Sequence, residues 1–302
     1  MEHVLLVGAT SQLGRALLEV LLGREVRVRA LVRRRPEVPL PSVVEVVHGD
    51  LMVPSTLPAA CRGMEGVISI AGAPLLPWWT PPSLTFDRID HLGTRALALA
   101  AKADGVRRFV YLSVAGDYPS GLEYVDAHRR GEQAIAATGL ETLVVRATGF
   151  HGTLAPLVDL ARTGVLPVPG SGKVRTNPIA ERDLANILAD QLAAPPGTTA
   201  VGGPEVLTRR EIAERAFEAI GRPPRIVSPP TGLMRLGSRF LDLVNPRLAD
   251  IGSFVAHLHD HDGIAPCVGT IPLLESFREY ARGPSAAAGS TPPASPGVEE
   301  GA

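Results

Sequence analysis

Two glycines, Gly8 and Gly14, enclose the loop of the 302-residue sequence whose residue types point most directly to chemistry. Four apolar residues, 4–7, precede the loop as a buried strand would, and leucines at helical spacing follow it. Such a strand–loop–helix unit brings backbone N–H groups and the positive end of a helix dipole to a pyrophosphate. The sequence therefore predicts a dinucleotide site made by Gly8, Ala9, Thr10, Ser11, Gln12, Leu13 and Gly14.

The loop departs from a full glycine triplet at Ser11, which stands midway between the two glycines. A side chain at this position restricts the approach of phosphate to the backbone, although a hydroxyl can donate a hydrogen bond to a phosphate oxygen. An ordinary strand–turn–helix unit without a ligand is the alternative interpretation of this segment.

The end of the next strand carries arginines where the second nucleotide contact is expected. An alternating apolar run over residues 26–32 ends on Arg33 and Arg34, followed by a third arginine. A carboxylate at this place would accept a hydrogen bond from a free ribose 2′-hydroxyl, whereas arginine suits a 2′-phosphate. We therefore expect NADP as the cofactor, with NAD as the other possibility.

Two further strand ends carry residues that suit the same cofactor. The run over residues 43–51 ends in Gly-Asp-Leu, where Asp50, beside Leu51, can accept from an adenine amino group or can simply begin the next turn. The run over residues 66–72 ends on Ala71 and Gly72, whose small size leaves room for a nucleotide.

Polar side chains follow in the next strand and helix. The apolar strand over residues 108–113 carries Ser113 to the sheet edge where the phosphate loop is expected. In the helix that begins near residue 121, the i, i+4 spacing places Tyr124, His128 and Glu132 on one face.

These segments must be positioned by a fold in which strands and helices alternate. They alternate over residues 1–150, which predicts an α/β doubly wound parallel sheet, the Rossmann core that binds NAD(P). Residues 151–282 are expected to form a smaller C-terminal substrate lobe packed on that core. Within it, Thr208 and Glu211 have the spacing of a capping box that opens a helix. The tail, 283–302, is rich in Ala, Ser, Pro and Gly and is expected to be disordered.

Composition limits the classes of function. A net charge of −1 argues against a nucleic-acid partner. No apolar run reaches the length of a membrane span, so no integral membrane segment is expected, and Cys61 and Cys267 lack metal or redox spacing. We expect a cytoplasmic protein with a small-molecule substrate; the oligomeric state does not follow from the sequence.

The histidines of residues 257–261 lack helical spacing and a second ligand cluster, so we expect no metal site.

The combination of motifs resembles the NmrA-like branch of the atypical short-chain dehydrogenase/reductases. The resemblance rests on the phosphate loop, Gly-Asp-Leu, the Gly93-Thr94 helix and the runs GVRRFVYLSVAG and GLETLVVRATGF, and it spans roughly residues 1–280. It implies an NAD(P)-binding fold and a catalytic set of serine, tyrosine and a lysine four residues after the tyrosine. Ser113 and Tyr124 match by position, whereas the lysine position holds His128.

The departure at His128 leaves three functions to be distinguished. A lysine would keep a positive charge near the tyrosine and lower its pKa, whereas a histidine with its reference pKa of about 6.5 is mostly neutral at pH 7. The first hypothesis is an NADP-dependent oxidoreductase acting on a small organic carbonyl or alcohol. The second is a catalytically weak or inactive NADP(H)-binding sensor, regulatory or assembly protein. The third is a sugar-nucleotide epimerase or dehydratase.

Overall fold

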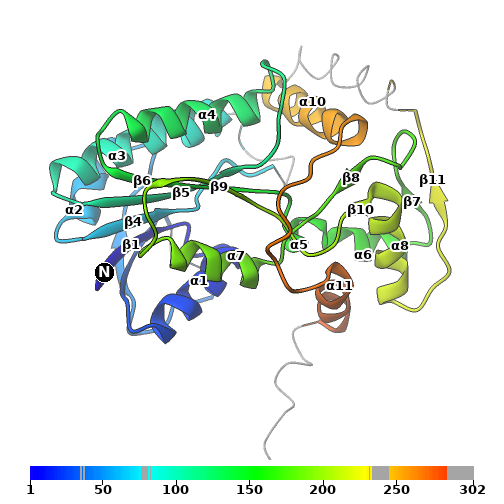
Figure 1. The fold of residues 1–302 in the computed structure, drawn as a ribbon, viewed down its shortest axis with the longest axis horizontal. Helices are drawn as coiled ribbons and strands as arrows, with labels where there is room; N and C mark the ends of the chain where they lie inside the picture. The colour runs from blue at the N-terminus through cyan, green and yellow to red at the C-terminus, as the bar shows by residue number, and fades with distance from the viewer. Residues whose placement is uncertain are drawn as a thin grey trace, which may run out of the picture.

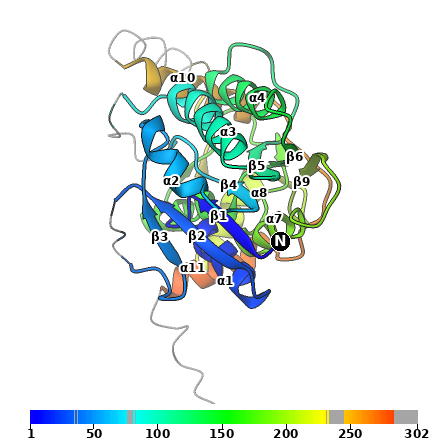
Figure 2. The ribbon, with the colours of Figure 1, turned by 90° about the vertical axis from the view of Figure 1, so that its left-hand side faces the viewer.

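A seven-stranded parallel sheet forms the centre of the computed structural model, which describes residues 1–34, 36, 38–75, 81, 83–230, 232 and 245–283. The strand order is β3-β2-β1-β4-β5-β6-β9, and each pair of neighbours runs parallel. Figure 2 shows this order across the sheet. The strands are β1 (His3–Val7), β2 (Arg27–Val32), β3 (Glu45–His48), β4 (Gly66–Ser69), β5 (Arg108–Val114), β6 (Glu141–Ala147) and β9 (Gly197–Val201).

Helices cover both faces of the sheet, so the predicted doubly wound Rossmann fold is confirmed (Figure 1). Helices α1 (Gln12–Gly23) and α7 (Glu181–Asp190) pack on one face, while α2 (Leu57–Cys61), α3 (Thr94–Ala103) and α4 (Glu123–Ala136) pack on the other. Alternate residues of β1 pack against the helices on the two faces of the sheet. Leu6 faces the first and Leu5 the second, which is why the strand is apolar throughout.

The strand order reverses beside β1, between β1 and β4. In open parallel sheets, ligands bind in the crevice at the carboxyl ends of the strands at such a switch point. The loop that begins at Gly8 follows β1, and the segment with Ala71 and Gly72 follows β4. The fold therefore brings two of the predicted cofactor segments to the same crevice.

Three elements differ from the sequence prediction. The helix expected around Gly93 and Thr94 begins as a π-helix, η2 (Asp87–Gly93), before α3. On η2, the Asp90 carboxylate accepts from the Ala73 N–H at 3.2 Å. Strand β3 is shorter than expected because Thr56 Oγ1 accepts the Asp50 N–H, which starts a turn. Strand β4 ends at Ser69, three residues before the predicted end. A short 3-10 helix, η1 (Pro54–Thr56), leads into α2.

The segments after residue 150 build a smaller lobe beside the sheet (Figure 1). Its own apolar core includes Val158, Phe217 and Phe277. The chain also returns to the large sheet as α7 and β9, so the lobe is made of separate segments, and its role in holding substrate stays a prediction. Apart from Gly283, the predicted disordered tail lies outside the described residues. The elements are α5 (His151–Leu154), α6 (Pro156–Arg162), β7 (Leu166–Pro167), β8 (Arg175–Thr176), β10 (Leu207–Thr208), α8 (Arg209–Ala219), β11 (Ile226–Val227), α10 (Pro246–Asp260) and α11 (Leu273–Arg282).

The predicted capping box at the start of α8 is confirmed. The Glu211 N–H donates to Thr208 Oγ1 at 3.1 Å, and the Thr208 N–H donates to the Glu211 carboxylate at 2.7 Å. We expect Thr208→Ala to lower the free energy of unfolding by about 1 kcal/mol, because α8 loses a cap for one of its free N–H groups. Urea unfolding measures the change, and Thr208→Ser is the control that keeps the hydroxyl. Equal stability of all three proteins would contradict the capping role.

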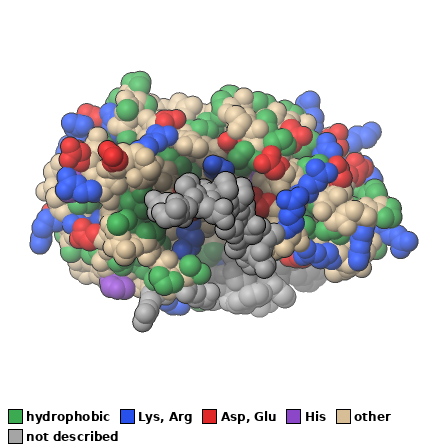
Figure 3. Space-filling model, turned by 90° about the horizontal axis from the view of Figure 1, so that it is seen from below, with side chains coloured by type: hydrophobic (Ala, Val, Ile, Leu, Met, Phe, Trp, Pro, Cys, Tyr) green, Lys and Arg blue, Asp and Glu red, His purple; other side chains and the backbone are tan. Residues whose placement is uncertain are grey.

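None of the described helices is long and apolar enough to cross a membrane. On the face in Figure 3, acidic and basic side chains are interspersed, and Lys and Arg are numerous at the end formed by the smaller lobe. Cytoplasmic location stays a prediction.

Candidate nucleotide site and reaction site

A cavity of about 650 Å³ opens at the carboxyl ends of β1, β2 and β4. Its volume lies within the range of pockets that hold small ligands and cofactors. The cavity brings together most of the residues that the sequence predicted for the cofactor, namely Gly8, Thr10, Ser11, Arg33, Arg34, Asp50, Leu51, Ala71 and Gly72.

The remaining loop residues support the cavity without lining it. Ala9 and Leu13 are buried in the core between the sheet and α1. A Cβ on Gly14 would lie 2.7 Å from the Ala9 carbonyl carbon and closer still to the Gly8 oxygen, so α1 can approach β1 this closely only with glycine there. Gly8 itself has a φ of +103°, a conformation that favours glycine.

Ser11 has a different role from the one that its hydroxyl suggested. Ser11 is the N-cap of α1, and its Oγ accepts the Gly14 N–H at 3.0 Å and donates to the Gly8 oxygen at 2.9 Å. The hydroxyl therefore holds the loop together, and its hydrogen is already donated within the loop. The N–H groups of Gln12 and Leu13, in the first turn of α1, have no protein acceptor among the described residues. These two donors suit an anionic group at the helix N-terminus.

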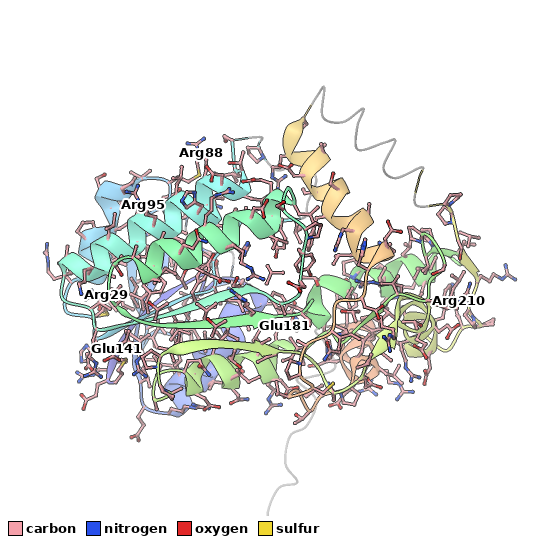
Figure 4. All side chains as sticks on the ribbon, turned by 45° about the horizontal axis from the view of Figure 1, so that its top comes forward. Arg29, Arg88, Arg95, Glu141, Glu181 and Arg210 are labelled. Atoms are coloured by element: carbon pink, nitrogen blue, oxygen red, sulfur yellow. The ribbon has the colours of Figure 1, made fainter. Side chains whose placement is uncertain are left out.

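The Gln12 side chain lies toward the smaller lobe and away from the cavity. A Cβ on Gly152 would meet both the Gln12 amide and the Glu181 carboxylate. Figure 4 shows Glu181 where the sheet meets the lobe. Glu181 accepts the Gly152 N–H at 2.8 Å, and burial raises the pKa of this carboxyl. The structure therefore places Gln12 at the junction with α5.

The charge of the cavity lining is mainly positive. Arg33 and Arg34 are exposed and form no ion pair with a described residue. Arg15, which sequence reasoning missed, also lines the cavity and donates to the Val38 oxygen at 2.7 Å. The sequence signal for a role of Arg15 at the cavity was its position directly after Gly14, in the first turn of the helix. The lining carboxylate, Asp50, accepts the Met52 N–H at 2.9 Å, so it does begin the next turn.

Tyr124 lies in an aromatic cluster on the first turn of α4. Its ring centroid is 5.2 Å from that of Phe86, 4.5 Å from that of Phe254 on α10 and 4.8 Å from that of His128. Burial, and after it the charge of Asp90, raises the pKa of Tyr124 well above its ordinary value. The phenol therefore stays protonated at neutral pH, the opposite of the lowered pKa that a nearby lysine would give.

His128 is buried below Tyr124 and faces Asp90. Its Nδ1 lies 2.8 Å from the Tyr124 carbonyl oxygen, and its Nε2 lies 3.7 Å from Asp90 Oδ1. The Asp90 carboxylate also lies just behind the cavity wall, because a Cβ on Gly72 would be 2.9 Å from Asp90 Oδ1. Sequence reasoning missed Asp90 as a functional residue, because Asp87, Arg88 and His91 beside it make it look like one of several polar residues at a helix start.

Ser113 and Tyr124 are not brought into contact with each other. The buried Ser113 hydroxyl donates to Glu132 Oε1 at 2.5 Å, and Glu132 also accepts from Arg129 at 2.6 Å and Arg146 at 2.5 Å. Although burial opposes it, the hydrogen bonds from Arg146 and Ser113 and the Arg129 charge hold the pKa of Glu132 below its ordinary value. In this arrangement Ser113 joins α4 to β5 and presents no free hydroxyl hydrogen to a substrate.

Among the residues that the structure describes, no group of three or more His, Cys, Asp or Glu could hold a metal ion, and these residues include the histidine segment of α10. The rings of His257 and His261 stack with centroids 4.1 Å apart, and His259 Nδ1 donates to the Val255 oxygen at 2.8 Å. The segment is helical through Asp260, contrary to the expectation that it has no helical spacing.

A glycine loop at a helix N-terminus, basic residues after β2 and a cavity at the switch point together define a dinucleotide-binding Rossmann protein. The sequence profile of the NAD(P)H-binding family matches residues 8–195, and the chain belongs to this family. The resemblance to the NmrA-like, atypical short-chain dehydrogenase/reductases is thereby confirmed.

Reductases are among the relatives of this chain. A ceramide reductase from Caulobacter vibrioides is 34% identical over 250 residues, which cover 78% of this chain and 76% of that protein. An NAD(P)H azoreductase from Xenophilus azovorans is 28% identical over 95% of this chain and 99% of its own length. The protein is therefore a member of an NAD(P)-binding family of oxidoreductase type.

The fold is shared with sugar-nucleotide enzymes at low sequence identity. The UDP-glucose 4-epimerase of Thermus thermophilus, solved with NAD, superimposes with a TM-score of 0.69 over 93% of this chain and 99% of that chain. The two sequences are 20% identical, so this likeness concerns the fold alone.

Proposed function

We propose that this protein is an NADP(H)-dependent reductase that converts a small organic carbonyl to the alcohol. The observation that carries the proposal is the cavity that Arg33 and Arg34, both without ion-pair partners among the described residues, line together with Thr10 and Ser11 just before α1. Arginine binds a phosphate through paired, charge-assisted hydrogen bonds, as the 2′-phosphate of NADP requires.

The residues present fit such a nucleotide. Gly14 lets α1 pack closely against the loop after β1, and the N–H groups of Gln12 and Leu13, which have no acceptor among the described residues, meet the pyrophosphate position at the helix N-terminus. Ala71 and Gly72 supply a wall of small residues. When bound, NADPH supplies the hydride, and the protein supplies binding, orientation and a proton. The named reductase relatives support this direction of the reaction.

Tyr124 is the proton donor in this proposal, because its phenol is protonated at neutral pH and can give a proton to a carbonyl oxygen that gains negative charge. Ser113, which matches the catalytic serine of the family by position, has its hydroxyl hydrogen donated to Glu132. The proposal therefore leaves Ser113 in the contact between α4 and β5 and assigns the reaction site to Tyr124 and His128.

Replacing Tyr124 by phenylalanine tests this function. We expect Tyr124→Phe to lower the turnover of an accepted carbonyl by about a hundredfold or more, the usual contribution of a general acid. NADPH affinity, measured by fluorescence titration, should be unchanged. Tyr280→Phe is the matched control, since Tyr280 lies on α11 with its hydroxyl on Asp159. Unchanged turnover in Tyr124→Phe would remove the tyrosine from the mechanism.

An NADP(H)-binding sensor or assembly protein without turnover is the second candidate. The specific observation in its favour is that His128 stands in the lysine position while Ser113 is held by Glu132. A broad carbonyl screen at saturating NADPH separates the two. Tight NADPH binding with no NADPH consumption for any carbonyl would establish the sensor, and consumption with even one carbonyl would exclude it.

A further inference from the structure

A buried carboxylate and a buried imidazole meet between the cavity and Tyr124. Asp90 has no exposed surface, and His128 is 7% exposed. They come from different elements, η2 and α4, which pack so closely that a Cβ on Gly131 would collide with the Asp90 carbonyl oxygen. The position of the pair is therefore fixed by the packing of two helices.

The hydrogen-bond geometry fixes where one proton must be. His128 Nδ1 lies 2.8 Å from the Tyr124 carbonyl oxygen, which can only accept, so Nδ1 carries a hydrogen. In a neutral imidazole Nε2 would then be a bare acceptor, and it would face the Asp90 carboxylate at 3.7 Å. Two acceptors facing each other in a buried site are unfavourable unless a proton lies on one of them.

We infer that Asp90 and His128 form a buried ion pair with His128 as the imidazolium at neutral pH, and that this pair sets the charge beside Tyr124. With its proton, the pair has no net charge. Without it, Tyr124 faces a single uncompensated carboxylate. His128 thus stands where the family has a permanently positive lysine, but the net charge of the pair is zero with the proton and minus one without it, so it depends on pH.

The other titratable groups around the pair are two phenols and charged side chains with partners of their own. The buried guanidinium of Arg247, on α10, donates to the Leu84 oxygen at 3.1 Å and to the Pro74 oxygen. Tyr111 on β5 donates to the Asp90 carbonyl oxygen at 3.2 Å, and burial raises the pKa of Tyr111, so it remains a neutral phenol. Tyr118, in the loop after β5, also has its pKa raised by burial. The charged side chains nearby are paired elsewhere: Asp87 with His91 and Arg130, and Glu132 with Arg129 and Arg146.

The carboxylate is also suited to hold the proton on its partner. Burial raises the pKa of Asp90 to about 6, and the charge of His128 and the Ala73 N–H act in the opposite direction. The Ala73 N–H lies 3.2 Å and 3.3 Å from the two Asp90 oxygens, which favours the carboxylate form, and an imidazolium beside it offsets the cost of burying its charge.

The ion pair can be tested in the free protein, without nucleotide or substrate. In wild type, the assigned ¹⁵N resonances of His128 should show both ring nitrogens protonated at pH 7. In Asp90→Asn, the amide keeps an acceptor for the Ala73 N–H and offers a donor to Nε2, so His128 should be mostly neutral at pH 7. Asp87→Asn removes a charge from the same π-helix and should leave the His128 resonances unchanged.

Either of two results would overturn the ion pair. One is a neutral His128 in wild type at pH 7, which needs no variant and so does not depend on how Asp90→Asn folds. The other is a folded Asp90→Asn in which His128 remains doubly protonated at the same pH.

The effect on turnover rests on the proposed function. Loss of the pair's proton leaves a negative charge beside Tyr124 that disfavours its phenolate, so wild-type kcat should fall as pH rises through that step. In Asp90→Asn this alkaline decline should disappear, whereas a merely structural role would lower kcat equally at all pH values. An unchanged alkaline decline in the variant would refute the role of Asp90. Absence of turnover in wild type would defeat the proposed reductase, and the NMR result would still decide the pair.

Discussion

Replacing Gly14 with alanine should weaken nucleotide binding strongly. The new Cβ would lie 2.7 Å from the Ala9 carbonyl carbon and 2.8 Å from its Cα, and these are backbone atoms that cannot rotate away. Helix α1 must then move off β1, which takes the free N–H groups of Gln12 and Leu13 away from the phosphate position. We expect a loss of affinity of about a hundredfold or more, ~2.8 kcal/mol, in a fluorescence titration with NADPH.

The same substitution should also destabilise the domain by about 1–3 kcal/mol, the usual cost of overpacking. Gly23→Ala is the matched control at the other end of α1, since no atom lies within 4 Å of its added Cβ. Alanine is the better helix former, so this control should be neutral or slightly stabilising and should bind NADPH as wild type does. A folded Gly14→Ala protein with wild-type affinity would show that the loop is structural only.

The central fold could be predicted because its signals are local. The apolar run of β1, the change to helical spacing at Leu13 and the glycines around them all act within one strand–loop–helix unit. Strand β9 gave no such signal. Its sequence is GTTAV, its first three residues are exposed, and it pairs only at the edge of the sheet with β6. An edge strand without an apolar face is fixed by its partner and not by its own pattern.

The cofactor loop and its arginines could be proposed from spacing, since the requirement for glycine at close approach is visible in the residue type itself. The partners of Ser113 and His128 could not be predicted in this way. Ser113 meets Glu132, and His128 meets Asp90 across 38 positions of sequence, counted from 90 to 128. The last contact depends on a π-helical turn that sequence periodicity does not distinguish from an α-helix.

The cofactor preference should depend on Arg33 and Arg34 together. Both line the cavity at the end of β2, both are exposed, and neither has a carboxylate partner among the described residues. Changing both to alanine should weaken NADPH binding by about 2–4 kcal/mol, which is roughly 30- to 700-fold, and should leave NADH binding nearly unchanged. NADH lacks the 2′-phosphate that the two guanidinium groups would bind.

Parallel titrations of the double variant with NADPH and NADH measure this discrimination. Arg210→Ala is the control, because Arg210 is an exposed arginine in the smaller lobe (Figure 4), and its loss changes the net charge without touching the cavity. Higher salt should weaken NADPH binding to wild type more than to the double variant, since exposed charges are screened. Equal losses for NADPH and NADH would refute the NADP preference, because the arginines would then act on the part that both nucleotides share.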